Sequence, residues 1–221
     1  MKSIAIISQK GGSGKTTTAL HLAVAAQESG VQAVIIDLDP QASAAMWGQA
    51  RGETPPPVVS TQPAMLPRVL DTAAAQGADI AIIDTAPHAD SFALAAAEAA
   101  EALLVPCRPS VMDLRAMGNT FRICRLASKP ANIVLTQVDP FGTLAQEARA
   151  SLSDLGEGVC SVHICPVTLG RRVAFHHGLI DGKTALEYEP SGVAANEARA
   201  LLEYASSLVG LKTNERKVAH G

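Results

Sequence analysis

The segment Gln9–Thr17, with the sequence QKGGSGKTT, constrains the fold of this chain more than any other. It stands between a short apolar run, Ile4–Ser8, and a long helical pattern that opens at Lys15. A glycine-rich turn between a strand and a helix lets successive backbone N–H groups curl inward, and the positive end of the helix dipole adds to them. Turns of this kind bind phosphate groups, so the sequence predicts a nucleotide site here.

The side chains of this loop suit a triphosphate bound with Mg²⁺. The Lys15 ammonium can reach the β- and γ-phosphates, and the Thr16 hydroxyl can ligate the metal. The usual pattern has glycine where this chain has Gln9, and Lys10 places a second cation inside the loop. We therefore expect ATP and Mg²⁺ as cofactors and ATP hydrolysis as the activity. The expected nucleotide-binding residues of the loop are Gly11, Gly12, Ser13, Gly14, Lys15, Thr16 and Thr17.

Short apolar runs alternate with longer helical patterns along the chain. Because only 3% of the residues are aromatic, Ala, Val, Leu and Ile must build the core, which suits buried parallel strands under Ala-rich helices. The alternation predicts an α/β fold with a mostly parallel central sheet and helices on both faces. We expect one domain over residues 1–210 and a polar, frayed tail over residues 211–221.

The predicted elements are as follows. Strands are expected at Ile4–Ser8, Ala33–Asp37, Asp79–Asp84, Ala102–Cys107, Asn132–Thr136 and Val159–Ile164. Helices are expected at Lys15–Ser29, Pro63–Gln76, Ser91–Ala100, Leu114–Ser128, Leu144–Leu155 and Val193–Val209, with a proline-rich loop at Gly52–Gln62.

Three carboxylates follow predicted strands. Asp37 and Asp84 each end an apolar run, and Asp39 comes two residues after Asp37. Carboxyl ends of parallel strands line one edge of a sheet, which is also where the glycine-rich loop lies. One carboxylate can hold the water shell of a metal and another can orient an attacking water. Any one of them alone is equally well explained as a turn former, but three together favour the functional reading.

Three motifs in order resemble the deviant Walker group of P-loop ATPases. They are KGGSGKTT at Lys10–Thr17, DLDPQ at Asp37–Gln41 and IIDTAP at Ile82–Pro87, and the likeness extends from Ile4 to about Val209. The match is best to the ParA partition ATPases in their short form, which lacks an N-terminal DNA-reading domain. This resemblance implies a homodimer that encloses ATP, with Lys10 crossing to the nucleotide of the partner. It also implies that Asp39 polarises water, that Asp37, Asp84 and Thr16 lie on the metal side, and that hydrolysis is slow without a partner protein.

The same resemblance implies further contacts. Thr136, Gln137 and Pro166 fall where this family cradles the adenine. The ATP-bound dimers of the family bind DNA without reading sequence, and the matching cations here are Arg171, Arg172, Lys183 and Arg199. Because the net charge is −3, DNA binding would need the cations of two protomers together. A ParB-like or other small adaptor protein, and a plasmid or chromosome as cargo, are the implied partners.

Other functions stay open at this point. A MinD-like protein would need a membrane-binding C-terminal helix, and the tail after Leu208 is short and lacks aromatics. Related ATPases position carboxysomes or chemoreceptor clusters with the same chemistry. An iron–sulfur carrier would need paired cysteines, whereas Cys107 has no C-x-x-C partner. Without a signal-like run we expect a cytoplasmic protein, nucleoid-associated when ATP-bound and free of the membrane. Trp47, the only tryptophan, fits either a dimer face or the core.

Overall fold

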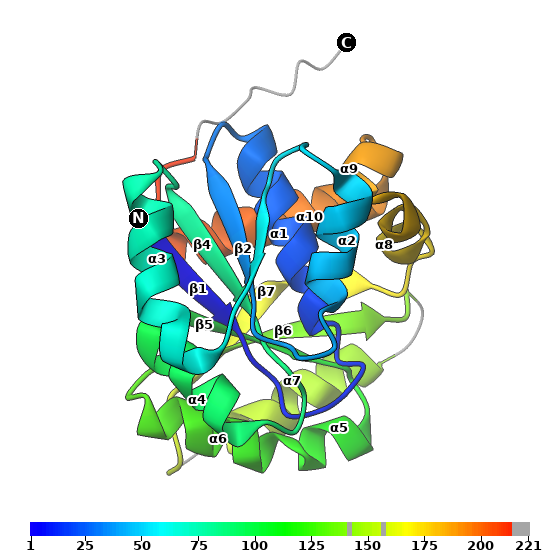
Figure 1. Cartoon of the computed structure of the whole chain (residues 1–221). Helices are drawn as coiled ribbons and strands as arrows, with labels where there is room; N and C mark the ends of the chain where they lie inside the picture. The colour runs from blue at the N-terminus through cyan, green and yellow to red at the C-terminus, as the bar shows by residue number, and fades with distance from the viewer. Residues whose placement is uncertain (141–142, 156–157, 214–221) are drawn as a thin grey trace.

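The computed structural model describes residues 1–140, 143–155 and 158–213. Within these residues a seven-stranded sheet runs in the order β3-β2-β4-β1-β5-β6-β7, and each pair of neighbours is parallel. Figure 1 shows this sheet between two layers of helices. The expected α/β fold with a mostly parallel sheet is therefore confirmed. The strands are β1 (Lys2–Ile6), β2 (Ala33–Asp37), β3 (Val58–Ser60), β4 (Ile80–Asp84), β5 (Ala102–Cys107), β6 (Ala131–Val138) and β7 (Val162–Gly170).

Alternate residues of the strands point to opposite faces of the sheet, and both faces are buried. In and just after β1, Ile4 and Ile6 belong to one core, and Ala5 and Ile7 belong to the other. This double burial explains why the strands read as continuous apolar runs. The first core is covered by α1 (Lys15–Glu28), α2 (Ser43–Arg51), α8 (Ala174–His177), α9 (Ala185–Tyr188) and α10 (Val193–Val209). The second is covered by α3 (Leu66–Ala75), α4 (Asp90–Ala99), α6 (Met117–Leu126) and α7 (Leu144–Leu155).

Several predicted boundaries were wrong. The region predicted as the loop Gly52–Gln62 contains β3, which forms only because it pairs with β2. The last strand runs later than predicted, from Val162 to Gly170 rather than Val159 to Ile164. The predicted helix Leu114–Ser128 is two helices, α5 (Val111–Arg115) and α6, separated at Ala116. Two 3₁₀ turns, η1 (Pro63–Met65) and η2 (Gly178–Asp181), complete the elements.

The expected tail begins in an ordered turn. Gly210 takes a left-handed conformation at the end of α10, and the Leu211 N–H donates to the Ser206 carbonyl. This is the usual hydrogen-bonded helix stop, and Leu211 packs on the core. The remainder of the predicted tail, residues 214–221, lies outside the described residues.

Candidate nucleotide-binding site

The carboxyl ends of three central strands bring the predicted motifs together. The register pairs Asp37 of β2 with Asp84 of β4, and Asp84 with Ile6 of β1. The glycine-rich loop leaves β1 directly after this point and leads into α1 (Figure 1). The fold therefore places the loop beside the two strand-end carboxylates, as the sequence predicted.

The conformation of the loop explains two of its glycines. Gly12 and Gly14 have φ values of +70° and +95°, in the left-handed region that side chains with a Cβ disfavour. Gly14 precedes the first turn of α1, and its carbonyl accepts from the Thr18 N–H at 2.8 Å. The loop therefore turns sharply and opens the helix with unpaired N–H groups at its start, which is the geometry of an anion site.

Lys15 is folded back over the loop and is 6% exposed. Its Nζ donates to the Lys10 carbonyl at 3.3 Å. Burial lowers the pKa of Lys15, and the charges of Asp84 and Asp39 oppose that effect. The ammonium therefore stays close to acidic groups at the strand ends, where the phosphates of a nucleotide would also be drawn.

A cavity of about 220 Å³ lies against the loop. Its wall includes Asp39, which follows β2, and Pro87, which follows β4. Pro87 was not among the predicted site residues. The other lining residues are Gly12, Gly14, Lys15, Thr16 and Thr17. Five of the predicted loop residues and the predicted water-orienting carboxylate therefore face one space.

Asp84 is fully buried, and burial raises its pKa to about 7. The Thr16 hydroxyl and the Lys15 ammonium act in the opposite direction, and Asp37 raises the pKa further. One oxygen accepts from the Thr85 N–H at 3.1 Å, whereas Oδ2 has no hydrogen-bond partner among the described residues. A buried carboxylate oxygen without a donor, next to a threonine hydroxyl, is what a bound cation would satisfy.

Asp37 is 1% exposed, and burial raises its pKa. Its two oxygens accept from the N–H groups of Asp39 and Ala45, each at 2.9 Å. Asp39 is half-buried, and its Oδ1 accepts from the Gln41 N–H at 2.9 Å. Asp37 thus shapes the chain after β2, while Asp39 is the carboxylate that reaches the cavity. No cluster of three or more metal-ligating side chains occurs among the described residues, and Mg²⁺ usually needs only one or two carboxylates besides phosphate.

The end of β6 braces the loop. The Thr136 hydroxyl donates to the Ser13 carbonyl at 2.7 Å, and the Gln137 amide donates to the Gly12 carbonyl at 2.9 Å. Both residues also line a small hollow of about 30 Å³ next to Gly14. Arg171 and His176 line it as well, which the sequence reading did not anticipate.

Pro166, predicted to lie with Thr136 and Gln137, is not part of this hollow in the described structure. It is exposed within β7, before Thr168, and Thr168 is the residue that pairs with Leu135 of β6. The reason is the later end of β7: the strand continues to Gly170, so Gly170 and Arg171 reach the sheet edge instead.

The four predicted DNA-contacting cations divide into two pairs. Arg172 donates to Glu197 at 2.7 and 2.9 Å, and Arg199 donates to Glu28 at 2.9 and 3.2 Å. Arg171 and Lys183 are exposed, and neither side chain bonds a described residue. The first pair therefore stabilises the packing of α10, and only the second pair stays available to a polyanion.

Lys10 lies near a partly buried ion pair, Arg108 with Asp113, that was not predicted from the sequence. Asp113, 3% exposed, accepts from Arg108 at 2.7 and 3.0 Å and from the Ser110 hydroxyl at 2.8 Å. Burial alone would raise the pKa of Asp113, but these bonds and the Lys10 charge outweigh it and lower the pKa. One indication of this ion pair was present in the sequence: β5 ends just before Arg108, at the edge of the sheet where the loop lies.

The cysteines show no sign of a cluster site. Cys107, Cys124 and Cys165 are buried, and Cys160 is half-buried. Burial raises the pKa of the Cys107 and Cys124 thiols to about 12, so both stay protonated, and thiolates are the forms that bind metal. Among the described residues, no helix is long and apolar enough to cross a membrane.

Comparisons with known proteins identify a nucleotide-binding domain. Residues 4–177 match the CobQ/CobB/MinD/ParA nucleotide binding domain. The maintenance of carboxysome distribution protein A of Gloeobacter kilaueensis is 33% identical over 201 residues, covering 89% of this chain and 88% of that protein. The chromosome-partitioning ATPase Soj of Thermus thermophilus is 28% identical over 240 residues, covering 92% and 94%. The septum site-determining protein MinD of Pyrococcus horikoshii, solved with Mg-ADP, superimposes with a TM-score of 0.74 at 19% identity, over 95% and 97% of the two chains.

Proposed function

Because the chain belongs to the CobQ/CobB/MinD/ParA family of nucleotide-binding domains, we propose that it is an ATPase whose ATP-bound dimer binds DNA and positions a cargo on it. The observation that carries the proposal is the 220 Å³ cavity, where Lys15, Thr16 and Asp39 meet around the glycine turns. Cation, hydroxyl and carboxylate are the groups that water attack on a terminal phosphate needs.

The residues of this edge fit Mg²⁺. Asp84 offers a buried oxygen that lacks a donor, and Thr16 lies close enough to lower the pKa of that carboxyl. Thr16, Asp84 and Asp37 would hold the metal, directly or through its water shell. When bound, Mg²⁺ supplies charge neutralisation to the phosphate oxygens.

The chain's own groups would carry out the remaining chemistry. Asp39 orients a water molecule whose oxygen forms a bond to the γ-phosphorus while the bond to the β–γ bridging oxygen breaks. Lys15 stabilises the charge that grows on the phosphate oxygens, and Lys10 of a second copy adds to it. We assign Lys10 to the site of a second copy because Lys15, and not Lys10, is among the residues that line the cavity of its own chain.

DNA contact is assigned to Arg171 and Lys183, since Arg172 and Arg199 are held in ion pairs. These two cations alone are too few for strong binding to phosphates, so we propose that a dimer combines those of two protomers. A small adaptor protein would link the dimer to its cargo and stimulate hydrolysis. The names of the two relatives, one for carboxysome distribution and one for chromosome partitioning, support a protein assembly or a DNA element as that cargo.

Calorimetry with Mg-ATP tests the proposal directly. The wild-type chain should bind the nucleotide, and Lys15→Ala should lose binding because the phosphate charge is no longer compensated. Arg68→Ala is the matched control, since Arg68 is an exposed cation on α3, away from the loop. If folded wild-type protein has no affinity for Mg-ATP, the proposed function is wrong.

A further inference from the structure

The helix α2 is held at both ends by contacts with other elements. At its start, the N-cap residue Ala42 provides no side-chain acceptor. Asp37 takes that role from the end of β2, since its Oδ2 accepts from the Ala45 N–H at 2.9 Å. Helix starts need such acceptors, because their first N–H groups have no partner within the helix. The carboxylate on the proposed metal side therefore also fixes the beginning of α2.

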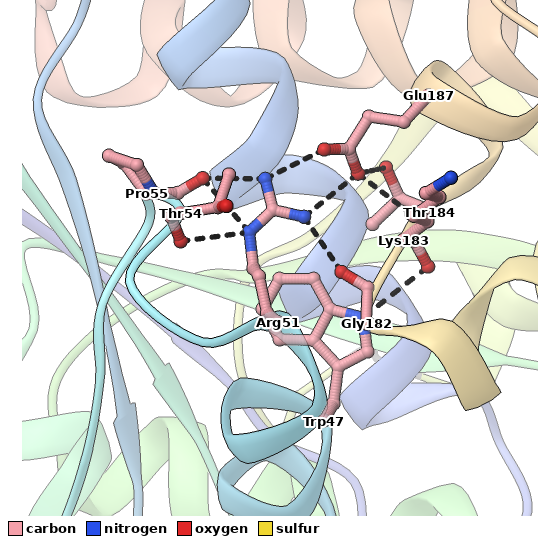
Figure 2. A network of polar contacts seen from close by, with 8 residues as sticks. All are labelled: Trp47, Arg51, Thr54, Pro55, Gly182, Lys183, Thr184 and Glu187. Atoms are coloured by element: carbon pink, nitrogen blue, oxygen red, sulfur yellow. Dashed lines mark hydrogen bonds and ion pairs between the residues drawn. The ribbon is translucent and has the colours of Figure 1, made fainter.

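At the other end, Arg51 is almost completely buried, with 5% of its side chain exposed. Figure 2 shows its guanidinium surrounded by acceptors. It forms an ion pair with Glu187 of α9 at 2.7 Å and donates to the Gly182 carbonyl at 2.7 Å. It also donates to the carbonyls of Thr54 and Pro55 in the segment that leads to β3. A buried guanidinium with this many partners holds its surroundings in one arrangement.

Trp47 completes the network one turn earlier in α2. Its indole lies under the guanidinium, with 4.8 Å from the ring centroid to the Arg51 Cζ, and its Nε1 donates to the Lys183 carbonyl at 3.3 Å (Figure 2). Its 4% exposure places it in the core, which settles the question that the sequence left open.

Three successive residues of the segment after η2 are thus tied to α2 and α9. The Gly182 carbonyl binds Arg51, the Lys183 carbonyl binds Trp47, and the Thr184 N–H donates to Glu187 at 2.9 Å. Lys183, the middle residue, is exposed and is one of the two cations that we assigned to DNA contact. The backbone from which this cation projects is therefore held by α2.

We infer that Trp47 and Arg51 are positioning residues that couple the nucleotide site to the DNA-binding surface, with α2 as the rigid connection. The inference rests on the proposed function. When phosphate and metal change the hydrogen bonds of Asp37, the start of α2 shifts. The segment Gly182–Thr184, which contacts the other end of α2, then moves with the helix. It does so because the contacts of the buried Arg51 side chain are closely packed. Two discrete arrangements of one packed element are the physical basis of such coupling.

A purely structural role makes different predictions. If the network only fastens α9 to α2, its loss lowers stability but leaves the ratio of DNA affinities with and without Mg-ATP unchanged. Coupling predicts that this ratio falls while nucleotide affinity stays the same. The ratio is therefore the quantity to measure.

Two conservative variants test the inference. Trp47→Phe keeps the aromatic ring and removes the N–H donor, and Arg51→Lys keeps the charge and removes the forked geometry. Each should bind Mg-ATP with wild-type affinity, and the ATP-dependent gain in affinity for a DNA duplex should fall by about tenfold, within the usual range for coupled sites. Arg68→Lys, at an exposed position of α3, is the matched control and should behave as wild type. A wild-type ratio in folded Trp47→Phe and Arg51→Lys overturns the inference.

The single tryptophan gives a readout that does not need DNA. Because the Trp47 indole is bonded to the Lys183 carbonyl and lies under Arg51, its fluorescence should change when Mg-ATP binds wild-type protein, and the change should shrink in Arg51→Lys. If saturating Mg-ATP leaves the emission unchanged, the coupling is wrong whatever DNA does. If the emission responds but wild-type protein never binds DNA, the coupling stands and the proposed DNA function fails.

Discussion

At the scale of single residues, the three acidic groups at the sheet edge have different surroundings. Asp84 and Asp37 are buried, and burial raises the pKa of each, whereas Asp39 is half-buried and lines the cavity. Sequence spacing placed all three at one edge correctly. It could not predict which of them are buried and which one lines the cavity, because their burial and their hydrogen bonds are set by the packing of the strands and of α2.

Asp39→Ala should separate binding from hydrolysis. Among the described residues the Asp39 carboxylate accepts one hydrogen bond, from the Gln41 N–H, so its removal should leave the fold and the loop intact. We expect wild-type affinity for Mg-ATP, hydrolysis slowed by about a hundredfold or more, and a longer-lived ATP dimer. Phosphate release and size-exclusion chromatography measure the two effects. Normal hydrolysis by this variant would remove Asp39 from the mechanism.

His21 should make the protein sensitive to acid. It is fully buried, its Nδ1 donates to the Thr17 carbonyl at 2.8 Å, and its Nε2 accepts from the Ala185 N–H at 3.0 Å. Burial lowers its pKa to about 4, below the ordinary value of 6.5, so the unfolded chain takes up the proton first as the pH falls. Stability is then lost between pH 6.5 and pH 4, by on the order of 3 kcal/mol.

Urea unfolding of wild-type protein and His21→Gln across this pH range isolates the effect of His21. The free-energy difference between them should change across the interval and be constant above it. Parallel pH profiles for the two proteins would show that His21 carries no such penalty.

At the scale of elements, the contact between α2 and η2 depends on a missing side chain. Gly182 has a φ of +67°, and a Cβ there would lie 2.4 Å from the Arg51 nitrogen and 2.5 Å from its Cα. Backbone atoms at this distance cannot move aside as a flexible side chain could. The two segments can pack together only because position 182 carries no Cβ.

Gly182→Ala should therefore be much more damaging than Gly77→Ala. Gly77 also has a positive φ, of +90°, but a Cβ there meets nothing within 4 Å. We expect about 1 kcal/mol of destabilisation at Gly77, from backbone strain alone, and several kcal/mol at Gly182. Thermal unfolding of both variants measures the difference. Equal losses would mean that α2 and η2 are less closely packed than the structure shows.

The elements that could be predicted from sequence are those whose own pattern determines them. The five central strands are apolar runs that end at polar residues, and the loop before α1 has a specific glycine spacing. Strand β3 was missed because three residues after a proline run have no pattern of their own and depend on pairing with β2. Helix α9 did carry a signal, the Thr184 to Glu187 capping box, that was not recognised in the sequence.

At the scale of the whole molecule, DNA binding should require both ATP and low salt. A dimer that presents Arg171 and Lys183 twice offers four cations, so the slope of log affinity against log salt should lie between about −3 and −4. Lys183→Ala removes two of the four and should reduce that slope by about 2. Arg172→Ala is the contrasting variant, since its ion pair with Glu197 already occupies it. Filter binding at several salt concentrations checks this, and equal retention without ATP would contradict it.

The common direction of all the strands has a practical consequence for live-cell imaging. Every strand enters the sheet at the rim opposite the nucleotide cavity, and the turns there, at residues 29–32, 77–79 and 127–130, contribute nothing to the walls of that cavity. A fluorescent protein spliced into the turn at residues 127–130 would project from this far rim. The position of the protein in a cell could then be followed while the edge that carries the cavity stays unaltered.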